Sequence, residues 1–242
     1  MKYTVIILAG GKGKRIKKLT VKKPKPLVKI LNKPFIEYQI DLLRKQKVKK
    51  LIISIGYKGK EIIDFIKNKK YKDIDISFYK DGKSPLGTGG ALKKIFKNIK
   101  GTFIILYGDS YLPISIKNIE KNFIKSKKDG LLTIYKNKNK FDKSNVKIIN
   151  KKVFYNKFKT DNNMKYIDYG LSILKSKVLT DFNTNKRFDL SELIYKLCLN
   201  HRMAYTIVKK RFYEIGSYKG IKDFKTYIRK KNVHEKIYPR IN

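Results

Sequence analysis

Three glycines and an arginine follow the first apolar run of the chain, and together they could hold an anion. The segment Leu8–Arg15 reads Leu-Ala-Gly-Gly-Lys-Gly-Lys-Arg. Glycines let the backbone turn sharply and point its N–H groups at an anion, and Arg15 is placed to contact phosphate oxygens. The segment lacks the Gly-Lys-Ser/Thr of a P-loop and the third glycine and later acidic residue of a dinucleotide fingerprint. It predicts phosphate binding, although the same residues also fit a tight turn after a strand.

Lys25 and Asp109 are the next candidates for chemistry on phosphates. Lys25 lies between Pro24 and Pro26, and flanking prolines predict an extended backbone that holds the lysine rigidly, as suits a phosphate. Asp109 follows Gly108 at the end of an apolar run. A carboxylate at the carboxyl end of a parallel strand lies where α/β proteins bind ligands, and it suits Mg²⁺. Taken alone, each residue also fits a plain loop lysine or a turn aspartate.

Two later segments add candidates for binding. Pro85–Leu92 reads Pro-Leu-Gly-Thr-Gly-Gly-Ala-Leu and opens a predicted helix. Its small residues would let a flat ligand approach, and a helix N-terminus favours anions. Glu214 precedes the last predicted helix and is a candidate second acidic metal ligand, whereas Ser217 fits an N-cap.

Apolar periodicity up to residue 109 predicts strands and helices in alternation. The predicted strands are Tyr3–Ala9, Leu51–Ile55, Ile74–Tyr79 and Thr102–Tyr107. The predicted helices are Pro34–Gln46, Glu61–Ile66 and Gly89–Ile99. This alternation is typical of an α/β fold with a mostly parallel sheet and helices on both faces.

The pattern changes after Gly130, where shorter strands and turns prevail. The predicted strands there are Leu131–Tyr135, Val146–Ile149, Val153–Tyr155 and Tyr166–Leu174, and the predicted helices are about Leu190–Leu199 and Tyr218–Lys230. No flexible linker and no fixed-period repeat interrupts the chain. We therefore expect one domain over residues 1–242, in which about 1–129 bind a nucleotide and about 130–242 build a second substrate pocket.

The composition is strongly basic, with 60 Lys and Arg against 19 Asp and Glu and a formal net charge of +41 over 242 residues. Only 7 of the basic residues are Arg, and the Lys residues are spread along the chain. Nucleic-acid readers usually show Arg forks and clustered basic tracts, so we interpret the lysines as solvated surface whose field favours anionic ligands. The single cysteine excludes an intrachain disulfide. No apolar run approaches the roughly 18 residues of a membrane span and no signal peptide is evident, so we expect a soluble cytoplasmic protein.

Together, five ordered segments are far more specific than any of them alone. Gly-Gly-Lys-Gly-Lys-Arg, Pro-Lys-Pro, Pro-Leu-Gly-Thr-Gly-Gly-Ala, Gly-Asp and Glu-Ile-Gly-Ser occur in that order. This arrangement resembles the sugar-1-phosphate nucleotidyltransferase family across nearly the whole chain. Members make an NDP-sugar from an NTP and a sugar 1-phosphate, release pyrophosphate and use Mg²⁺. The resemblance implies a single domain with a Rossmann-like, glycosyltransferase-A-like mixed sheet and helices on both faces.

The resemblance also implies roles for individual residues. Arg15, Lys25 and Asp109 would be catalytic, with Arg15 on the triphosphate and Lys25 bridging phosphates in the transition state. Asp109 would bind Mg²⁺ with help from Glu214. The implied nucleotide-binding residues are Leu8, Ala9, Gly10, Gly11, Gly13, Arg15, Leu86, Gly87, Thr88 and Gly89. The attacking phosphate oxygen is already anionic, so the reaction needs no general base. This agrees with the sequence, whose only histidines, His201 and His234, lie late in the chain and away from these motifs.

A second set of residues would bind the sugar phosphate. These residues are Asn156, Lys157, Asp168, Tyr169 and Gly170, and Lys157 would hold the phosphate. Asn156 stands where the family often has Glu, and Asp168-Tyr169 stands where it often has Asn-Ala, so the pocket would gain a carboxylate and a ring. Glu214 replaces the usual Asp. These departures leave the chemistry in place and the identity of the sugar open.

The closest likeness is to the heptose- or mannose-1-phosphate guanylyltransferase branch, which implies GTP and a product for surface polysaccharide. Uridylyl-, thymidylyl- and cytidylyltransferases of the same family share nearly all these motifs. A glycosyltransferase that consumes an NDP-sugar is a further alternative, because Asp73 and Asp75 have the spacing of a DxD metal motif. A basic nucleic-acid-binding protein is the last alternative, and it would need a clustered basic face. We expect the two substrates as partners, no nucleic acid and no membrane, with a homo-oligomer possible.

Overall fold

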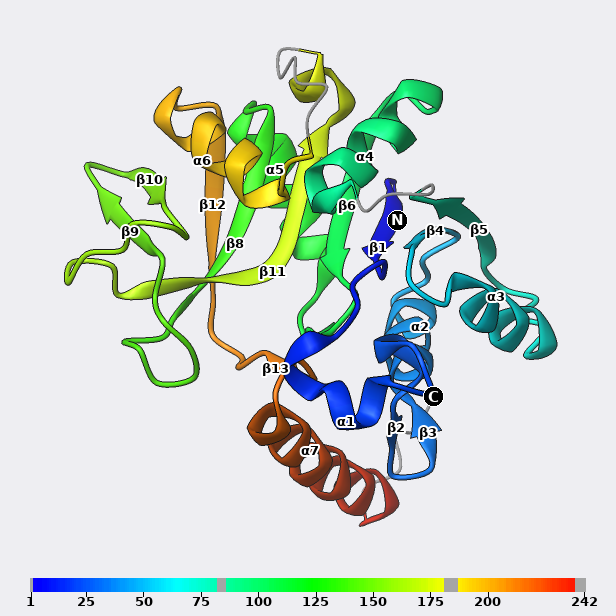
Figure 1. Cartoon of the computed structure of the whole chain (residues 1–242). Helices are drawn as coiled ribbons and strands as arrows, with labels where there is room; N and C mark the ends of the chain where they lie inside the picture. Colours follow the sequence, from blue (N-terminus) through cyan, green and yellow to red (C-terminus); the bar gives the residue numbers. More distant parts are fainter. Residues whose placement is uncertain (1, 82–85, 181–186, 238–242) are drawn as a thin grey trace.

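A computed structural model describes residues 2–81, 86–180 and 187–237 of the chain. Its centre is one mixed sheet in which the described strands follow the order β10-β9-β11-β6-β1-β4-β5, while β8 pairs with β11 and β12 pairs with β8 (Figure 1). The strands of this sheet are β1 (Thr4–Leu8), β4 (Lys50–Ile55), β5 (Asp75–Lys80), β6 (Thr102–Tyr107), β8 (Gly130–Lys136), β9 (Val146–Ile149), β10 (Lys152–Tyr155), β11 (Tyr166–Lys175) and β12 (Met203–Val208).

The strands β6, β1, β4 and β5 are parallel to one another. β11 then runs antiparallel to both β6 and β8, so the sheet continues from the first half of the chain into the second. Parallel strands end at the same edge of a sheet, and their carboxyl ends are where ligands bind in open α/β sheets. The segments that follow β1, β4, β5 and β6 therefore come together at one edge.

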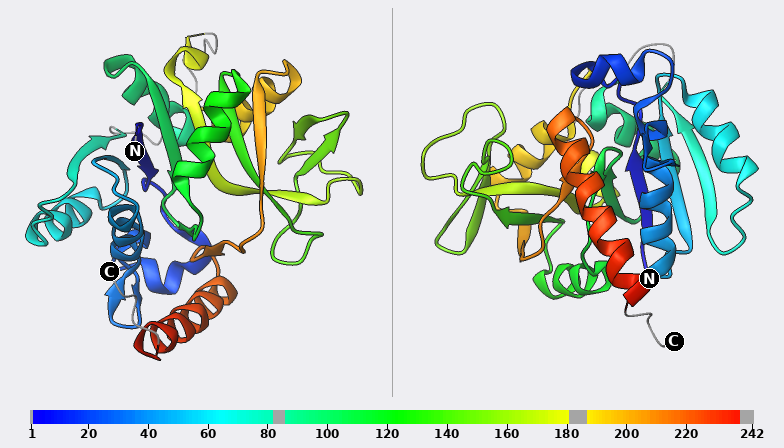
Figure 2. Two further views of the ribbon diagram at one scale, coloured as in Figure 1. Left: turned by 180° about the vertical axis from the view of Figure 1, so that it is seen from behind. Right: turned by 90° about the horizontal axis from the view of Figure 1, so that it is seen from below.

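Helices cover both faces of the sheet because neighbouring residues of a buried strand point in opposite directions. Val5 and Ile7 of β1 face a cluster that includes residues of α2 (Phe35–Lys45), α3 (Gly59–Asn68) and α5 (Ile116–Ser126). Ile6 and Leu8 face a second cluster with residues of α4 (Gly87–Asn98) and α6 (Leu190–Leu199). The two sides are visible in the turned views of Figure 2.

A third apolar cluster joins the two ends of the chain. Helix α7 (Tyr218–Ile237) places Phe224 against Phe35, with ring centroids 5.3 Å apart. The same cluster includes Ile16 of the 3-10 turn Lys14–Ile16 and Ile30 of β2 (Lys29–Ile30). The other short elements after β1 are α1 (Lys17–Thr20), the 3-10 turn Lys25–Leu27 and β3 (Lys33–Pro34). β7 (Ser110–Tyr111) and β13 (Tyr213–Glu214) form a separate two-stranded ribbon beside this cluster, and the 3-10 turn Ser176–Leu179 follows β11.

The predicted fold class is confirmed, and most predicted elements lie within a few residues of the observed ones. Besides the elements of two to four residues that lie outside the main sheet, which were not predicted, two longer ones were missed. Helix α5 has apolar residues at helical spacing and Ser115 as its N-cap, with Ser115 Oγ accepting the Asn118 N–H, so its sequence did carry a signal. The second is β12, a strand that pairs in parallel with β8. Helix α7 was predicted, but it extends beyond Lys230 to Ile237. In the part of the chain that the structure describes, no helix has the length and apolar character to cross a membrane.

Candidate active site

The Gly-rich loop leaves the sheet between the carboxyl ends of β4 and β6. The Ala9 N–H donates to the Ser54 carbonyl at 2.8 Å, and the Gly108 N–H donates to the Leu8 carbonyl at 3.0 Å. The loop then turns at Gly13, whose φ is 65°, in the left-handed region that favours glycine. A Cβ atom on Gly13 would lie 2.8 Å from Thr20 Cγ2. Backbone strain and space both require glycine at this turn.

Lys25 contacts Asp109, which lies 84 positions later in the chain. Its Nζ donates to Asp109 Oδ2 at 2.5 Å, and the two side chains are 14% and 28% exposed. The extended backbone predicted for Lys25 falls instead on Pro24, with φ −65° and ψ 148°, and Lys25 opens a 3-10 turn. The prediction of backbone conformation was therefore wrong by one residue, because a proline is tolerated inside the first turn of a helix, where its missing N–H has no partner to lose.

The ribbon of β7 and β13 brings the second acidic candidate beside Asp109. Glu214 pairs with Ser110 across the ribbon, and the Ile215 N–H donates to the Asp109 carbonyl at 2.9 Å. Neither residue is near the other in sequence. The antiparallel pairing therefore holds the two carboxylate-bearing segments side by side.

Gly216 marks the point where the charged side chains converge. A Cβ atom on Gly216 would lie 2.7 Å from Arg15 Nη2, 2.9 Å from Glu214 Oε2 and 3.1 Å from Lys25 Nζ. We call Arg15, Lys25, Asp109 and Glu214 the phosphate-side cluster. Its four charges come from four separate segments, and the structure brings all of them together.

The acidic pair suits a hard divalent cation. Glu214 is held by its own turn, since its carboxylate accepts hydrogen bonds from the Gly216 N–H and the Ser217 hydroxyl. Within the described ranges, no group of three or more His, Cys, Asp or Glu residues could hold a metal ion. Mg²⁺ differs from metals that need a full protein cage, because it is commonly bound by one or two carboxylates together with substrate phosphates and water. Asp109 and Glu214 fit that mode of binding.

Ser217 serves as an N-cap, as the sequence predicted. Its Oγ accepts the Gly220 N–H at 2.9 Å at the start of α7. This bond and the Glu214 contact join the metal-ligand candidate to the helix.

The segment predicted to line the base is bound to the start of α6. The Gly89 and Gly90 N–H groups donate to the Phe188 carbonyl at 3.1 and 3.3 Å, and the Leu190 N–H donates to Thr88 Oγ1 at 2.8 Å. The N-terminus of α4 was expected to offer its N–H groups to an anion. This expectation is wrong for the N–H groups of Gly89 and Gly90, because they already donate to the Phe188 carbonyl. Contact of Leu86, Gly87, Thr88 and Gly89 with a base stays a prediction, and Pro85 lies outside the described residues.

Asp168 is the centre of a second polar region, on β11. Its Oδ1 accepts the Gly170 N–H at 2.9 Å, and Tyr107 Oη lies 3.5 Å from its Oδ2. Burial raises the pKa of Asp168 to about 6, although the Gly170 hydrogen bond and the Lys157 ammonium act in the opposite direction. Burial and the Asp168 charge also raise the pKa of Tyr107. The structure thus brings together the predicted sugar-side residues Asp168 and Gly170, and the charge of Lys157 acts on the same carboxylate.

Of the other predicted sugar-side residues, Tyr169 points away from Asp168, and the side-chain oxygen of Asn156 is already hydrogen-bonded. Tyr169 is 1% exposed and packs against Phe212 at 5.9 Å between ring centroids. Adjacent residues on a strand face opposite sides, so the Tyr169 ring cannot share a pocket with the Asp168 carboxylate, and that prediction was wrong. Asn156 Oδ1 accepts the Phe158 and Lys159 N–H groups at 2.9 and 2.8 Å, so its oxygen stabilises a turn.

Asp81 is a site candidate that the sequence analysis missed. It follows β5 directly, and a Cβ atom on Gly10 would lie 2.5 Å from its Oδ2. Oδ1 accepts the Ser54 hydroxyl at 3.1 Å, whereas Oδ2 has no hydrogen-bond partner among the described residues. Burial raises the pKa of this carboxyl group. No motif in the sequence pointed to Asp81, because it lies before the Pro85–Leu92 segment. It reaches the Gly-rich loop only through the pairing of β5 with β4 and of β4 with β1.

Comparison with known proteins identifies the family. The family model described as nucleotidyl transferase matches residues 4–231. The chain belongs to the nucleotidyl transferase family. This result confirms the family recognised from the five ordered segments and the prediction that the protein is an enzyme.

Among curated relatives, this nucleotidyl transferase is 29% identical over 213 residues to a D-glycero-alpha-D-manno-heptose 1-phosphate guanylyltransferase from Campylobacter jejuni, covering 87% of this chain and 93% of the relative. A protein of the same name from Aneurinibacillus thermoaerophilus is 38% identical over 130 residues, which are 53% of this chain and 56% of the relative. Among solved structures, HddC from Yersinia pseudotuberculosis has a TM-score of 0.75 and 25% identity over 93% of this chain and 99% of its own. A putative glucose-1-phosphate thymidylyltransferase from Bacillus anthracis has a TM-score of 0.81 at 17% identity over 94% and 95%, which shows the shared fold.

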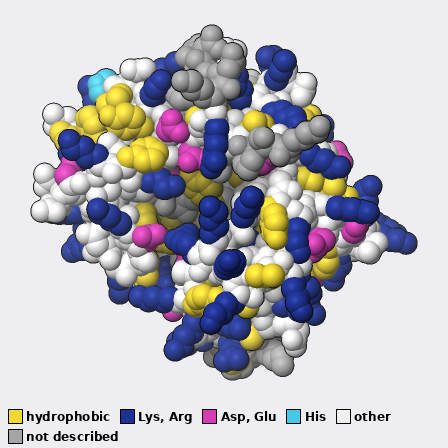
Figure 3. Space-filling model, viewed as in Figure 1, with side chains coloured by type: hydrophobic (Ala, Val, Ile, Leu, Met, Phe, Trp, Pro, Cys, Tyr) yellow, Lys and Arg dark blue, Asp and Glu magenta, His cyan; other side chains and the backbone are white. Residues whose placement is uncertain are grey.

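The geometry also weighs against the two alternatives from other classes. Asp73 accepts a hydrogen bond from Arg44 Nε at 2.7 Å, and Asp75 is exposed at the amino end of β5, the opposite end from the Gly-rich loop. A DxD metal site is therefore not supported there. Figure 3 shows Lys and Arg side chains spread over this face of the nucleotidyl transferase instead of forming one basic patch.

Proposed function

We propose that this protein transfers a guanylyl group from GTP to a heptose or hexose 1-phosphate, with D-glycero-α-D-manno-heptose 1-phosphate as the first candidate. A phosphate oxygen of the sugar 1-phosphate attacks the α-phosphorus of GTP, the bond between the α-phosphorus and the bridging oxygen breaks, and pyrophosphate leaves with that oxygen. The product is a GDP-sugar, which we expect to serve surface polysaccharide synthesis. The observation that carries the proposal is the phosphate-side cluster at the carboxyl edge of the sheet. The similarity to heptose 1-phosphate guanylyltransferases over most of both chains supports the choice of substrates.

The main barrier to this reaction is the approach of two polyanions and the charge that develops on the α-phosphate and pyrophosphate. Cations and fixed donors stabilise such charge. Lys25 and Arg15 converge beside Gly216, where they are placed to neutralise phosphate oxygens. Mg²⁺ held by Asp109 and Glu214 would supply further positive charge at the phosphates when bound. Lys25 already forms an ion pair with Asp109, so its ammonium is oriented before a nucleotide arrives.

Asp81 supports the choice of guanine. Guanine presents N1–H and the N2 amino group as neighbouring donors, and a carboxylate offers two acceptors and no donor. Uracil and thymine present carbonyl oxygens on both sides of one N–H, and a carboxylate repels those oxygens. Oδ2 of Asp81 lies against Gly10 and is not hydrogen-bonded within the described part of the chain. We propose that Asp81 reads the Watson–Crick edge of guanine.

Pyrophosphate release is the direct test of the function. GTP, CTP, UTP and dTTP would each be tested with Mg²⁺ against mannose, glucose and heptose 1-phosphates. We expect release with GTP alone, dependent on both the sugar 1-phosphate and Mg²⁺. Release with a different single NTP would overturn the guanylyl assignment, and absence of release with every pair would overturn the proposed transfer to these sugars.

The same assay tests Asp81 with a matched pair of variants. Asp81→Asn should reduce the preference for GTP over the other NTPs about tenfold or more, because a charge-assisted hydrogen bond to the base is lost. Asp75→Asn, an exposed carboxylate at the other end of the same strand, should leave the preference unchanged. Equal preferences in the two variants would show that Asp81 does not read the base.

A further inference from the structure

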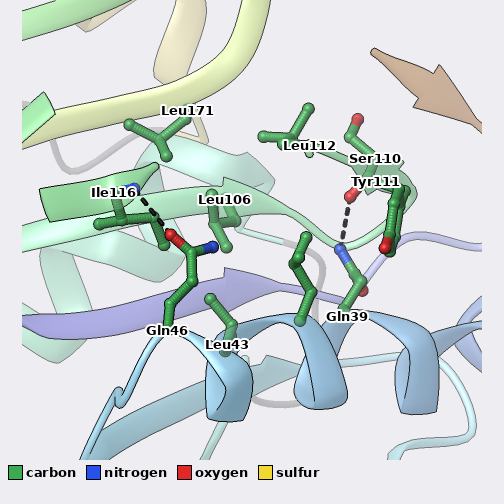
Figure 4. A pocket seen from close by; sticks show the side chains of 10 residues that line it. Gln39, Leu43, Gln46, Leu106, Ser110, Tyr111, Leu112, Ile116 and Leu171 are labelled. Carbon is green, nitrogen blue, oxygen red and sulfur yellow. Dashed lines mark hydrogen bonds between the residues drawn. The ribbon is translucent and has the colours of Figure 1, made fainter. Parts of the chain in front are cut away.

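Gln39 lies behind the turn that carries Asp109. The residue belongs to α2 and is 3% exposed. Its Nε2 donates to the Tyr107 carbonyl at 3.0 Å and to the Ser110 carbonyl at 2.8 Å. Figure 4 shows the side chain rising from α2 toward Ser110. Both N–H bonds of one amide group therefore hold the two carbonyls that flank Gly108-Asp109.

These two carbonyls lie where the regular strand pattern is interrupted. β6 ends at Tyr107 and β7 begins at Ser110, so the chain changes its partner between them, from the central sheet to the ribbon with β13. Buried carbonyl groups need donors, and the interruption leaves two of them facing α2. A primary amide satisfies both with one nitrogen. The amide is also uncharged. A lysine at the same position would place a second positive charge close to the Lys25–Asp109 ion pair.

We propose that Gln39 is the positioning residue for Asp109 and that it fixes the direction in which the Asp109 carboxylate meets the metal–nucleotide complex. This inference rests on the proposed function, because it takes Asp109 as a ligand of Mg²⁺ bound with GTP. Gln39 itself touches neither substrate nor metal. It acts through the backbone on both sides of Asp109, and such outer contacts commonly change metal affinity or activity 10- to 100-fold when they are removed.

The molecule supplies a control glutamine at the C-terminal end of the same helix. Gln46 is the C-cap of α2, seven residues after Gln39, and both side chains line one cavity of about 10 Å³. Gln46 Oε1 accepts the Ile116 N–H at 2.8 Å, at the start of α5 and away from Asp109. Among the described residues, each glutamine leaves one buried amide atom without a partner, Oε1 of Gln39 and Nε2 of Gln46. The two residues therefore line the same cavity and differ in the turn that they hold, although Gln39 is buried and Gln46 is half-buried.

The test compares Gln39→Met with Gln46→Met, since methionine keeps the length and approximate volume of glutamine without its donors. Binding of Mn²⁺ and GTP is measured by calorimetry without sugar 1-phosphate, so that no turnover occurs, and kcat and Tm are measured alongside. We expect Gln39→Met to weaken Mn²⁺–GTP binding about tenfold and to lower kcat at least as much. Gln46→Met should also lower Tm, because the Ile116 N–H loses its acceptor, and should leave both affinity and kcat within about twofold of the parent protein.

Equal affinities and kcat values in the two variants would overturn the positioning role. A parent protein that binds no Mn²⁺–GTP would instead overturn the proposed function, so the two failures are distinguishable. Gln39→Glu provides a second variant if Gln39→Met does not fold. A protonated glutamic acid can donate to one carbonyl whereas its carboxylate cannot, so the kcat of Gln39→Glu relative to the parent protein should rise as the pH is lowered. A ratio that does not change with pH would contradict the proposal.

Discussion

The phosphate-side cluster and the Asp168 region both place charged groups beside the sheet, but they hold them in different ways. In the phosphate-side cluster, Lys25 and Asp109 are partners in an ion pair, and Glu214 accepts hydrogen bonds from its own turn. Asp168 has a backbone N–H and a tyrosine hydroxyl as hydrogen-bond partners. The Lys157 ammonium favours the charged form of Asp168 through its field, and the two side chains form no ion pair within the described residues. Burial consequently raises the pKa of Asp168 to about 6.

This difference separates the part of the site that is ready before binding from the part that a ligand must complete. An ion pair that is already formed needs little reorganisation when phosphates arrive, and such preorganisation is the main source of electrostatic catalysis. A buried carboxylate without a directly bonded cation is unstable in its charged form, and a ligand that donates hydrogen bonds to it would relieve that instability. The phosphate side should therefore determine the rate, and the Asp168 side should determine which sugar binds.

The largest expected effect comes from breaking the ion pair on the phosphate side. Lys25→Ala and Asp109→Asn should each lower kcat by about 100-fold or more, the size of effect seen when a transition-state donor is lost. Steady-state kinetics with GTP and the best sugar 1-phosphate measure this change. Lys23→Ala, an exposed lysine two residues earlier, is the control and should retain normal turnover. Near-normal kcat in both Lys25→Ala and Asp109→Asn would contradict the assignment of the site.

A smaller and pH-dependent effect is expected at Asp168. Its pKa is raised from 3.8 to about 6 in the folded protein, so the unfolded chain loses this proton first as the pH rises. The stabilisation from Asp168 is complete below about pH 4 and is lost as the pH rises through about 6, a change of at most about 3 kcal/mol in the free energy of unfolding. Urea unfolding at pH 4.5 and 7.5 measures it. Asp168→Asn should gain stability relative to the parent protein at the higher pH.

The kinetics of Asp168→Asn then test whether this instability serves substrate binding. If sugar hydroxyls donate to the carboxylate, the variant should show a KM for the sugar 1-phosphate about tenfold higher, with a smaller change in kcat, because a hydrogen bond to a charged group is lost. Asp142→Asn alters an exposed loop carboxylate and should change neither quantity. A variant that is more stable and binds the sugar 1-phosphate normally would show that Asp168 has no part in the pocket.

The smallest effect on activity is expected at Asp129, which belongs to neither region. Its variant shows whether a loss of stability alone changes the rate. Its carboxylate lies 3.3 Å from Lys175 Nζ, 3.0 Å from Lys177 Nζ and 2.9 Å from Arg202 Nε. Burial opposes ionisation, but the hydrogen bonds from these cations outweigh it and lower the pKa of Asp129 to about 2. Asp129 therefore stabilises the fold above about pH 4, and this stabilisation is lost as the pH falls toward 2.

Asp129→Asn should lower the free energy of unfolding at pH 7 by about 1–2 kcal/mol, less than the full pKa shift implies because the partners are partly solvated. The kcat should stay at the value of the parent protein. Urea unfolding and steady-state kinetics check the two statements on the same sample. A marked fall in kcat would mean that loss of stability alone changes the rate. A lower kcat in the Lys25 and Asp109 variants would then not show that the phosphate-side cluster determines the rate.

The predictions from the sequence succeeded where the relevant interactions are local. Glycine at position 13 is required by a left-handed φ of 65° within the loop itself. Ser217 caps the helix that begins beside it. The alternation of apolar runs indicated the sheet and its two helical faces, because burial on both faces of parallel strands produces continuous apolar segments.

The prediction for the Tyr169 ring failed because the facing of a strand residue depends on register. The motif order placed Asp168 and Tyr169 together in one pocket, yet strand geometry sends their side chains to opposite faces. Antiparallel pairing with β6 and β8 sets which of the two faces meets Tyr107. No nearby residue carries that information.

The sequence by itself determined the family, the fold class and the residue types at the nucleotide end, because these depend on local backbone requirements, apolar periodicity and an ordered set of motifs. The tertiary structure alone decided which of those residues meet. Lys25 reaches Asp109 across 84 positions of the chain, Asp81 reaches Gly10 through two strand pairings, and Gln39 holds the turn around Asp109 from a helix. The physical reason is that side-chain partners over such separations are set by strand register and helix packing, which no local pattern of residues specifies.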